Sequence, residues 1–208
     1  MSPSGRPNPA AGLDSAGAEG LAPEVLSWVH ESGNPYYDWF FGGPERARSV
    51  LADWMRRPSS EVFEDRTTLM VERGRVIGGY IALSEADLRE CRAADAVASI
   101  RAVGRAGIAS LRERLEAARL LFPPPEPGDL YLSKMGLLQE YRGAGRGRAL
   151  LEEFLAASGA RGFRRFRLDV WTQNRPALCL YRSVGFETVA ESRAAAADLT
   201  YAQMSLER

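Results

Sequence analysis

Hydrophobic positions recur at helical spacing in the first part of the chain. Val25 and Trp28 lie on one face of a helix predicted over residues 22–31, and the same spacing predicts a second helix over 44–57. Between them, residues 33–43 (GNPYYDWFFGG) hold five aromatic side chains bounded by glycines. A cluster of this kind is typical of a core or of a pocket wall.

The pattern then changes to short runs of β-branched and apolar residues. Residues 66–72 and 75–83 are separated by an Arg-Gly turn, which predicts two antiparallel strands. Residues 84–121 return to amphipathic helical spacing, interrupted by two glycines, and a proline-rich segment at 123–128 ends the helix.

After the prolines, apolar runs alternate between strand and helix patterns. The predicted order is strand 129–137, helix 143–158, strand 163–171, helix 174–184, then strands 185–191 and 198–206. This order implies an α/β (α+β) fold with a mixed sheet, right-handed crossovers in its middle and an antiparallel end.

Length and composition suit one globular domain. The 208 residues are 45% apolar, and 27 basic residues balance 27 acidic ones. Zero net charge argues against a general nucleic-acid binder or a polybasic membrane binder. Residues 1–20 have little to bury and are predicted to be a disordered tail, with one domain over 21–208. Since no apolar run suits a bilayer span or a secretory leader, we expect a cytoplasmic protein.

The few cysteine and histidine residues limit the chemistry further. Cys91 and Cys179 form no CxxC pair and His30 stands alone, so no disulfide framework and no metal site are predicted. We expect Cys179 to be buried, Cys91 to be partly exposed among arginines, and His30 to be half-exposed on its helix.

The most informative stretch is QEYRGAGRGRALL at residues 139–151, where a strand meets a helix. Unpaired amides beside a helix N-terminus, with glycines that allow close approach, favour a phosphate ligand. A dinucleotide fingerprint fails because Arg148 stands where glycine is required, and no Walker Gly-Lys-Ser/Thr is present. The pattern that does fit is Arg/Gln-x-x-Gly-x-Gly/Ala, through Arg142, Gly145 and Gly147.

A second motif, NRPALCLYRSVGF at residues 174–186, follows the strand RFRLDVW. Together the two motifs resemble the GNAT superfamily of N-acetyltransferases, over residues 66–206. The resemblance implies a mixed, centrally splayed sheet flanked by helices, with residues 84–128 as a helical insertion and Pro-rich loop before the cofactor-binding strand.

The resemblance also implies acetyl-CoA as co-substrate. Backbone groups of Met135, Gly136 and Leu137 would contact the pantetheine arm, and Asn174 would contact it or position the following helix. Tyr181 would direct its hydroxyl toward the thioester sulfur and assist the leaving thiolate. The residues expected around the pyrophosphate are those of the glycine-rich turn: Arg142, Gly143, Ala144, Gly145, Arg146, Gly147 and Arg148.

The reaction implied is direct attack by a neutral primary amine of a small molecule or peptide, in a ternary complex. Many relatives carry a glutamate on the strand before the turn, but residues 130–138 contain no acid. The alternatives for the base are Glu64, Asp65, Asp169, or a water relay through Ser133 or Tyr131.

In the superfamily that the chain resembles, the segments before the central sheet and the loops over the cleft select the acceptor. The aromatic segment and the insertion, with Asp38, Glu61, Glu64 and Asp65 near in sequence, favour a cationic or amphipathic amine, although the aromatics would serve equally as core. Two other functions stay open: a catalytically degenerate acyl-CoA sensor or structural module, and an RNA-associated protein using RGAGRGR, which zero net charge disfavours. No nucleic-acid or membrane partner is expected, and a homodimer is one possible assembly.

Overall fold

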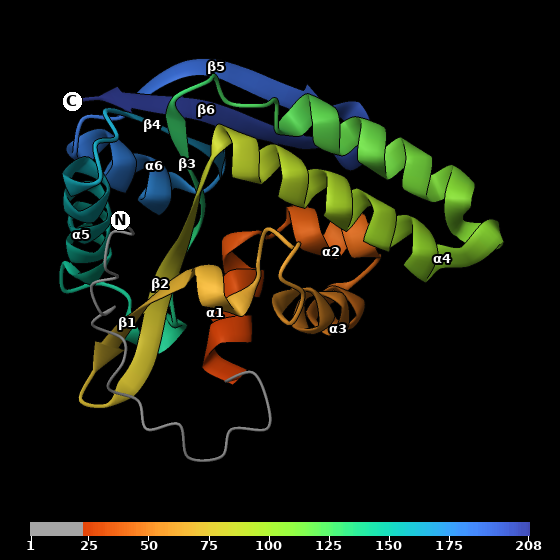
Figure 1. Ribbon diagram of the computed structural model, residues 1–208, viewed down its shortest axis with the longest axis horizontal. Helices are drawn as coiled ribbons and strands as arrows, with labels where there is room; N and C mark the ends of the chain where they lie inside the picture. The colour runs from red at the N-terminus through yellow and green to blue at the C-terminus, as the bar shows by residue number, and fades with distance from the viewer. Residues whose placement is uncertain (1–22) are drawn as a thin grey trace, which may run out of the picture.

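The structure is a computed structural model that describes residues 23–208, except for the side chains of residues 102–107. The tail predicted over residues 1–20 lies outside the described residues. Six strands form one sheet in the order β1-β2-β3-β4-β6-β5 (Figure 1). Their bounds are β1 Thr67–Glu72, β2 Arg75–Ser84, β3 Asp129–Leu137, β4 Arg165–Trp171, β5 Glu187–Ala194 and β6 Leu199–Glu207.

The sheet is mixed and opens at its centre. Among neighbouring strands, only β3 and β4 pair in parallel, and their pairing ends at Tyr131 and Arg167. Both strands continue beyond that point, to Leu137 and Trp171, without pairing to each other. The mixed, centrally splayed sheet is therefore confirmed: one crossover joins the neighbouring parallel strands β3 and β4, and a second runs from β4 to β5, on the other side of β6.

Helices cover both faces of the sheet (Figure 1). On one face α1 (Pro23–Ser32), α2 (Tyr36–Phe41), α3 (Pro44–Met55) and α4 (Glu85–Leu121) surround a core that includes Trp28 and Leu51. On the other face α5 (Arg146–Ala160) and α6 (Arg175–Ser183) pack on residues such as Phe166, because alternate β4 side chains are buried. The sequence did not predict α2. The remaining short elements are η1 Glu64–Arg66, η2 Gln139–Tyr141 and η3 Ala195–Ala197.

The insertion between β2 and β3 folds back on itself. Figure 1 shows the two halves of α4 side by side, and Arg92 Nη1 donates to the Phe122 carbonyl at 3.1 Å. A straight helix would separate these two residues by about 45 Å. The glycines expected to interrupt the helix, Gly104 and Gly107, lie among residues 102–107, outside the described side chains. None of the described helices has the length and apolar character that a bilayer span requires.

Candidate active site

The glycine-rich turn between β3 and α5 presents backbone to solvent. Gly143, Ala144 and Gly145 have φ of +85°, +49° and +77°, and a Cβ added at either glycine would meet nothing within 4 Å. No side chain caps the N-terminus of α5, and although the Arg146 amide donates to the Gly143 carbonyl at 3.2 Å, the next amides, of Gly147 and Arg148, stay open beside the positive end of the helix dipole. The turn therefore has the space and the donors that a pyrophosphate needs.

The arginine side chains of this turn are already engaged with other groups. Arg146 forms a two-bond pair with Glu72, at 2.8 and 3.1 Å. Arg142 pairs with Glu31 and donates to the Leu137 carbonyl at 3.1 Å. Arg148 donates to Ser183 Oγ at 2.8 Å and pairs with Glu152 at 2.9 Å. Backbone amides, more than guanidinium groups, are thus free for an anion.

Gly147 has a packing role that the sequence did not indicate. A Cβ at this position would lie 3.4 Å from Leu180 Cδ2, so α5 rests closely on α6 here. Unlike Gly143 and Gly145, this glycine therefore has neighbours in van der Waals contact with its Cβ direction.

The end of β3 borders the opening in the sheet. Met135, Gly136 and Leu137 pair with β2 on one side, while their other edge has left β4. Backbone groups on that edge are placed to meet an extended ligand entering between the strands.

A cavity of about 510 Å³ lies on the α1–α4 face and reaches this opening. Aromatic side chains of α2, together with Trp54, Phe122 and Tyr201, form its apolar wall. The charged and ionisable side chains in the wall are Arg89, Arg92, Arg119, Lys134, Glu61, Asp95 and Asp169.

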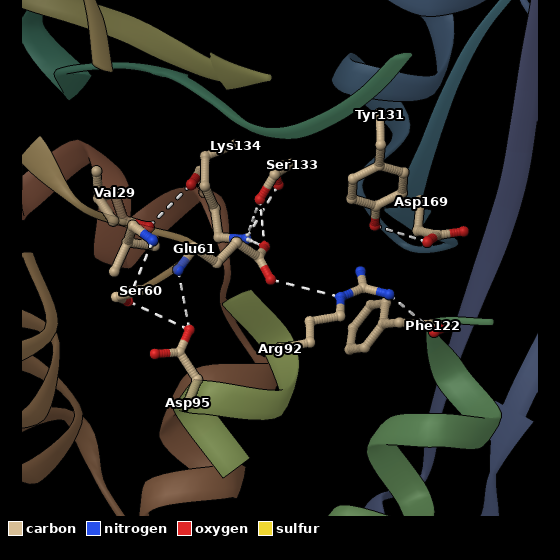
Figure 2. Close-up of polar contacts among 12 residues, drawn as sticks. Val29, Ser60, Glu61, Arg92, Asp95, Phe122, Tyr131, Ser133, Lys134 and Asp169 are labelled. Atoms are coloured by element: carbon tan, nitrogen blue, oxygen red, sulfur yellow. Dashed lines mark hydrogen bonds and ion pairs between the residues drawn. The ribbon is translucent and has the colours of Figure 1, made fainter. Parts of the chain in front are cut away.

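A β-bulge places two adjacent residues of β3 on the cavity side. The register with β2 shifts between Ile81 and Ala82, leaving Ser133 as the extra residue. Successive strand residues ordinarily face opposite sides, but here Ser133 and Lys134 both reach Glu61 (Figure 2). Lys134 Nζ lies 2.8 Å from both the Glu61 carboxylate and Ser133 Oγ.

Glu61 is held as a largely buried anion by this network. Burial alone would raise the pKa of its carboxyl group, but Lys134, Arg92 and the hydrogen bonds outweigh burial and lower the pKa to about 2. Arg92 Nε completes the set at 3.4 Å from Glu61. A carboxylate stabilised in this way accepts a proton poorly, so Glu61 fits a structural ion pair and not a base.

Tyr131 and Asp169 form a second polar pair at the point where the strands part. The Tyr131 hydroxyl donates to Asp169 Oδ2 at 2.7 Å (Figure 2). Burial raises the pKa of Asp169 to about 6, although the hydrogen bond from Tyr131 and the charge of Arg92 oppose this. The Arg92 guanidinium carbon lies 5.0 Å from the centre of the Tyr131 ring. Asp169 is therefore a carboxylate at neutral pH with raised basicity.

Asp95 of α4 anchors the loop that carries Glu61. Its Oδ2 accepts from the Glu61 amide at 3.0 Å and from the Ser60 hydroxyl at 3.2 Å. Burial raises the pKa of this carboxyl group to about 7.

Comparison with known proteins identifies the family to which this chain belongs. The model of the Acetyltransferase (GNAT) family matches residues 29–186. The chain belongs to the GNAT acetyltransferase family. No curated protein matches it.

Solved structures share the GNAT fold of this chain at low sequence identity. An N-acetyltransferase from Staphylococcus aureus Mu50 has a TM-score of 0.64 at 15% identity, covering 87% of this chain and 92% of that one. A structure described as an acetyltransferase has a TM-score of 0.55 at 20% identity, with 88% and 90% covered. Ard1 from Thermoplasma volcanium has a TM-score of 0.51 at 14% identity, with 90% and 94% covered.

Two residues expected to be functional from the GNAT motifs lie on or beside α6. Asn174 Oδ1 accepts from the Ala177 amide at 3.2 Å and caps the helix, as one of its two expected roles requires. Tyr181 is 9% exposed and packs edge-to-face on Phe186, on the sheet face opposite the cavity. Burial raises the pKa of its hydroxyl to about 12, so this phenol stays protonated at neutral pH.

Several expectations for single residues of this GNAT chain were wrong. Cys91 is buried, which raises its pKa, whereas Cys179 is exposed, because the cysteine of α6 lies on the outer side of that helix. His30 is buried and lies 2.7 Å from Asp38 Oδ1, so it ties α1 to α2.

The described residues hold no group of three His, Cys, Asp or Glu side chains suited to a metal ion.

Of the acids considered from sequence, only two reach the cavity wall. Glu61 and Asp169 line it, while Asp38, Glu64 and Asp65 do not. Sequence reasoning missed Arg92 and Asp95, which look like ordinary charges of an amphipathic helix. A signal did exist for Lys134, because it is the only lysine of the sequence and stands inside an apolar strand.

Proposed function

We propose that this GNAT protein is an N-acetyltransferase that moves an acetyl group from acetyl-CoA to a primary amine by direct attack in a ternary complex. The observation that carries the proposal is the parting of β3 and β4 beyond Tyr131. The open turn at the N-terminus of α5 follows the end of β3, and the cavity with Asp169 reaches the same opening. The site thus has one place for the donor and one for the acceptor.

The chain's own residues fit acetyl-CoA at the turn and along β3. Amides of residues 143–147 would hold the pyrophosphate, because two of these positions have open space where a side chain would stand. The backbone of Met135, Gly136 and Leu137 would hold the pantetheine arm along the free edge of β3. When bound there, acetyl-CoA supplies the activated acetyl group.

Asp169 and Tyr131 are proposed to take the proton from the acceptor amine. Their pair faces the cavity, and a carboxylate with a pKa of about 6 is a better proton acceptor than Glu61, whose pKa is about 2. Glu64 and Asp65 are exposed and lie outside the cavity wall. Tyr181 remains the proposed donor to the departing thiolate, with Asn174 and Arg148 fixing α6 beside the turn.

The proposal is tested by following thiol release from acetyl-CoA with a panel of primary amines. We expect amine-dependent release that requires Asp169, with the Asp169→Asn variant still binding acetyl-CoA in calorimetry. If acetyl-CoA binds but no amine stimulates release, the degenerate sensor is the better account. If acetyl-CoA does not bind at all, the whole proposal fails.

A further inference from the structure

Three arginines of α4 gather where the main cavity meets a smaller one. A second cavity of about 190 Å³ shares Arg89, Arg92, Arg119 and Phe122 with the first. The folding back of α4 brings the arginines together, because Arg89 and Arg92 come from its first half and Arg119 from its second. Guanidinium groups arranged in this way suit recognition of a planar anion.

The cations of this wall differ in whether a carboxylate pairs with them. Arg89 pairs with Glu85 at 2.6 Å, whereas Arg92 and Lys134 share the single carboxylate of Glu61. Across the part of the chain that the structure describes, Arg119 forms no ion pair and no hydrogen bond. It is an exposed side chain on the cavity rim. The arginine wall therefore has spare capacity for one anion.

The opposite charge lines the same cavity. Asp169, with Tyr131, faces the opening in the sheet, and the Arg92 guanidinium carbon is 5.0 Å from the Tyr131 ring centre. A ligand with an amine and an anionic group on neighbouring atoms would satisfy both sides at once. Between them the wall is aromatic, and Tyr36 meets Phe122 edge-to-face at 4.8 Å.

We propose that the acceptor amine carries a carboxylate beside it, as an α-amino acid with an apolar or aromatic side chain does. Arg119 and Arg92 would bind the carboxylate while the amine faces Asp169. A purely cationic amine would leave Arg119 unmatched, and a dianionic phosphate would meet the carboxyl groups of the same wall. This inference rests on the proposed N-acetyltransferase function and specifies its acceptor.

The experiment compares matched acceptor pairs that differ only in the carboxylate: phenylalanine with phenethylamine, tryptophan with tryptamine, and leucine with isopentylamine. In the wild-type protein we expect kcat/KM at least about 10-fold higher for the amino acid in one or more pairs, as charge-assisted hydrogen bonds imply. Arg119→Ala should remove this preference by raising KM for the amino acid about 10-fold or more, with little change for the matched amine. Arg119→Lys should restore part of it.

Arg112→Ala is the matched control. Arg112 lies on the same half of α4, pairs with Glu116 at 3.1 Å and does not line either cavity, so its loss should leave the preference intact. Equal or better turnover of the amines that lack a carboxylate, or an equal effect of Arg119→Ala on both members of each pair, would overturn the inference and leave the N-acetyltransferase function standing. Absence of thiol release with every amine in the broad panel would overturn the function itself, and this inference with it.

Discussion

The Tyr131 hydroxyl donates a 2.7 Å hydrogen bond to Asp169, just past Arg167 on β4, and Tyr131 and Arg167 are the last pair that joins β3 to β4. Beyond this pair the two strands separate, so the hydrogen bond marks the inner end of the opening in the sheet. The partly buried Asp169 carboxylate lines the cavity beside that point.

The decrease of kcat at acidic pH should reflect protonation of Asp169. Because burial raises its pKa to about 6, kcat with saturating acceptor should fall as the pH drops below about 6, where the carboxylate takes up a proton. Asp169→Asn should lower kcat by about 10²-fold or more and abolish this acidic limb of the pH profile. In Tyr131→Phe the limb should move to higher pH, since the hydrogen bond from Tyr131 holds the Asp169 pKa down. An unshifted limb in both variants would assign the proton to another group.

Gly145→Asp should weaken acetyl-CoA binding by more than about 10-fold, since it places a negative charge beside the proposed pyrophosphate position. Calorimetric titration of the folded variant measures the effect. Gly162→Asp is the matched control, because Gly162 also has positive φ, at +95°, and open space around its Cβ direction, but follows the far end of α5. An equal loss in both variants would point to backbone strain, and retained affinity in Gly145→Asp would contradict the assignment of the turn.

Tyr181→Phe should lower kcat about 10-fold or more while the melting temperature changes little, since the ring contact with Phe186 is kept. With a pKa of about 12, the phenol itself should give no alkaline limb below about pH 11. Rapid-quench turnover and thermal unfolding of the same preparation separate the two effects. Unchanged kcat across the pH range would remove Tyr181 from the role of proton donor.

Asp95 should make the protein less stable as the pH rises from about 4 to about 7. Its pKa is raised on folding from 3.8 to about 7, so its contribution is fully present below pH 3.8 and is lost as the buried group ionises. Asp95→Asn keeps an oxygen acceptor and cannot ionise. We expect it to be more stable than wild type at pH 8, by on the order of 1–4 kcal/mol, and to approach wild-type stability at pH 4. Urea unfolding at both pH values measures the difference, and a constant offset would refute the assignment.

Much of the sheet could be predicted because its signals are local. The strand predicted over residues 129–137 is β3 with the same bounds, since prolines precede it and a glycine-rich turn follows it. The turn itself was predictable for a similar reason, because positive φ at Gly143 and Gly145 requires glycine in the sequence.

The cavity could not be predicted, because its contacts join distant parts of the chain. Glu61 and Lys134 are 73 positions apart, and neither residue shows its partner. The bulge at Ser133 breaks the alternation that sequence reasoning assumes, and so hides that Lys134 faces the cavity. The two glycines that interrupt the helical pattern of residues 84–121 do not show that the helix folds back, so the meeting of Arg92 and Phe122 could not be predicted from them.

The insertion α4 leaves the sheet at the end of β2 and returns at the start of β3, two strands that are already antiparallel neighbours. Residues can therefore be added to or removed from it without altering the pairing of any strand. Over evolutionary time, an insertion at such a loop lets a protein change which ligand it binds. The residues that bind its co-substrate can stay the same. It also marks the segment to graft or shorten when a new preference is to be engineered.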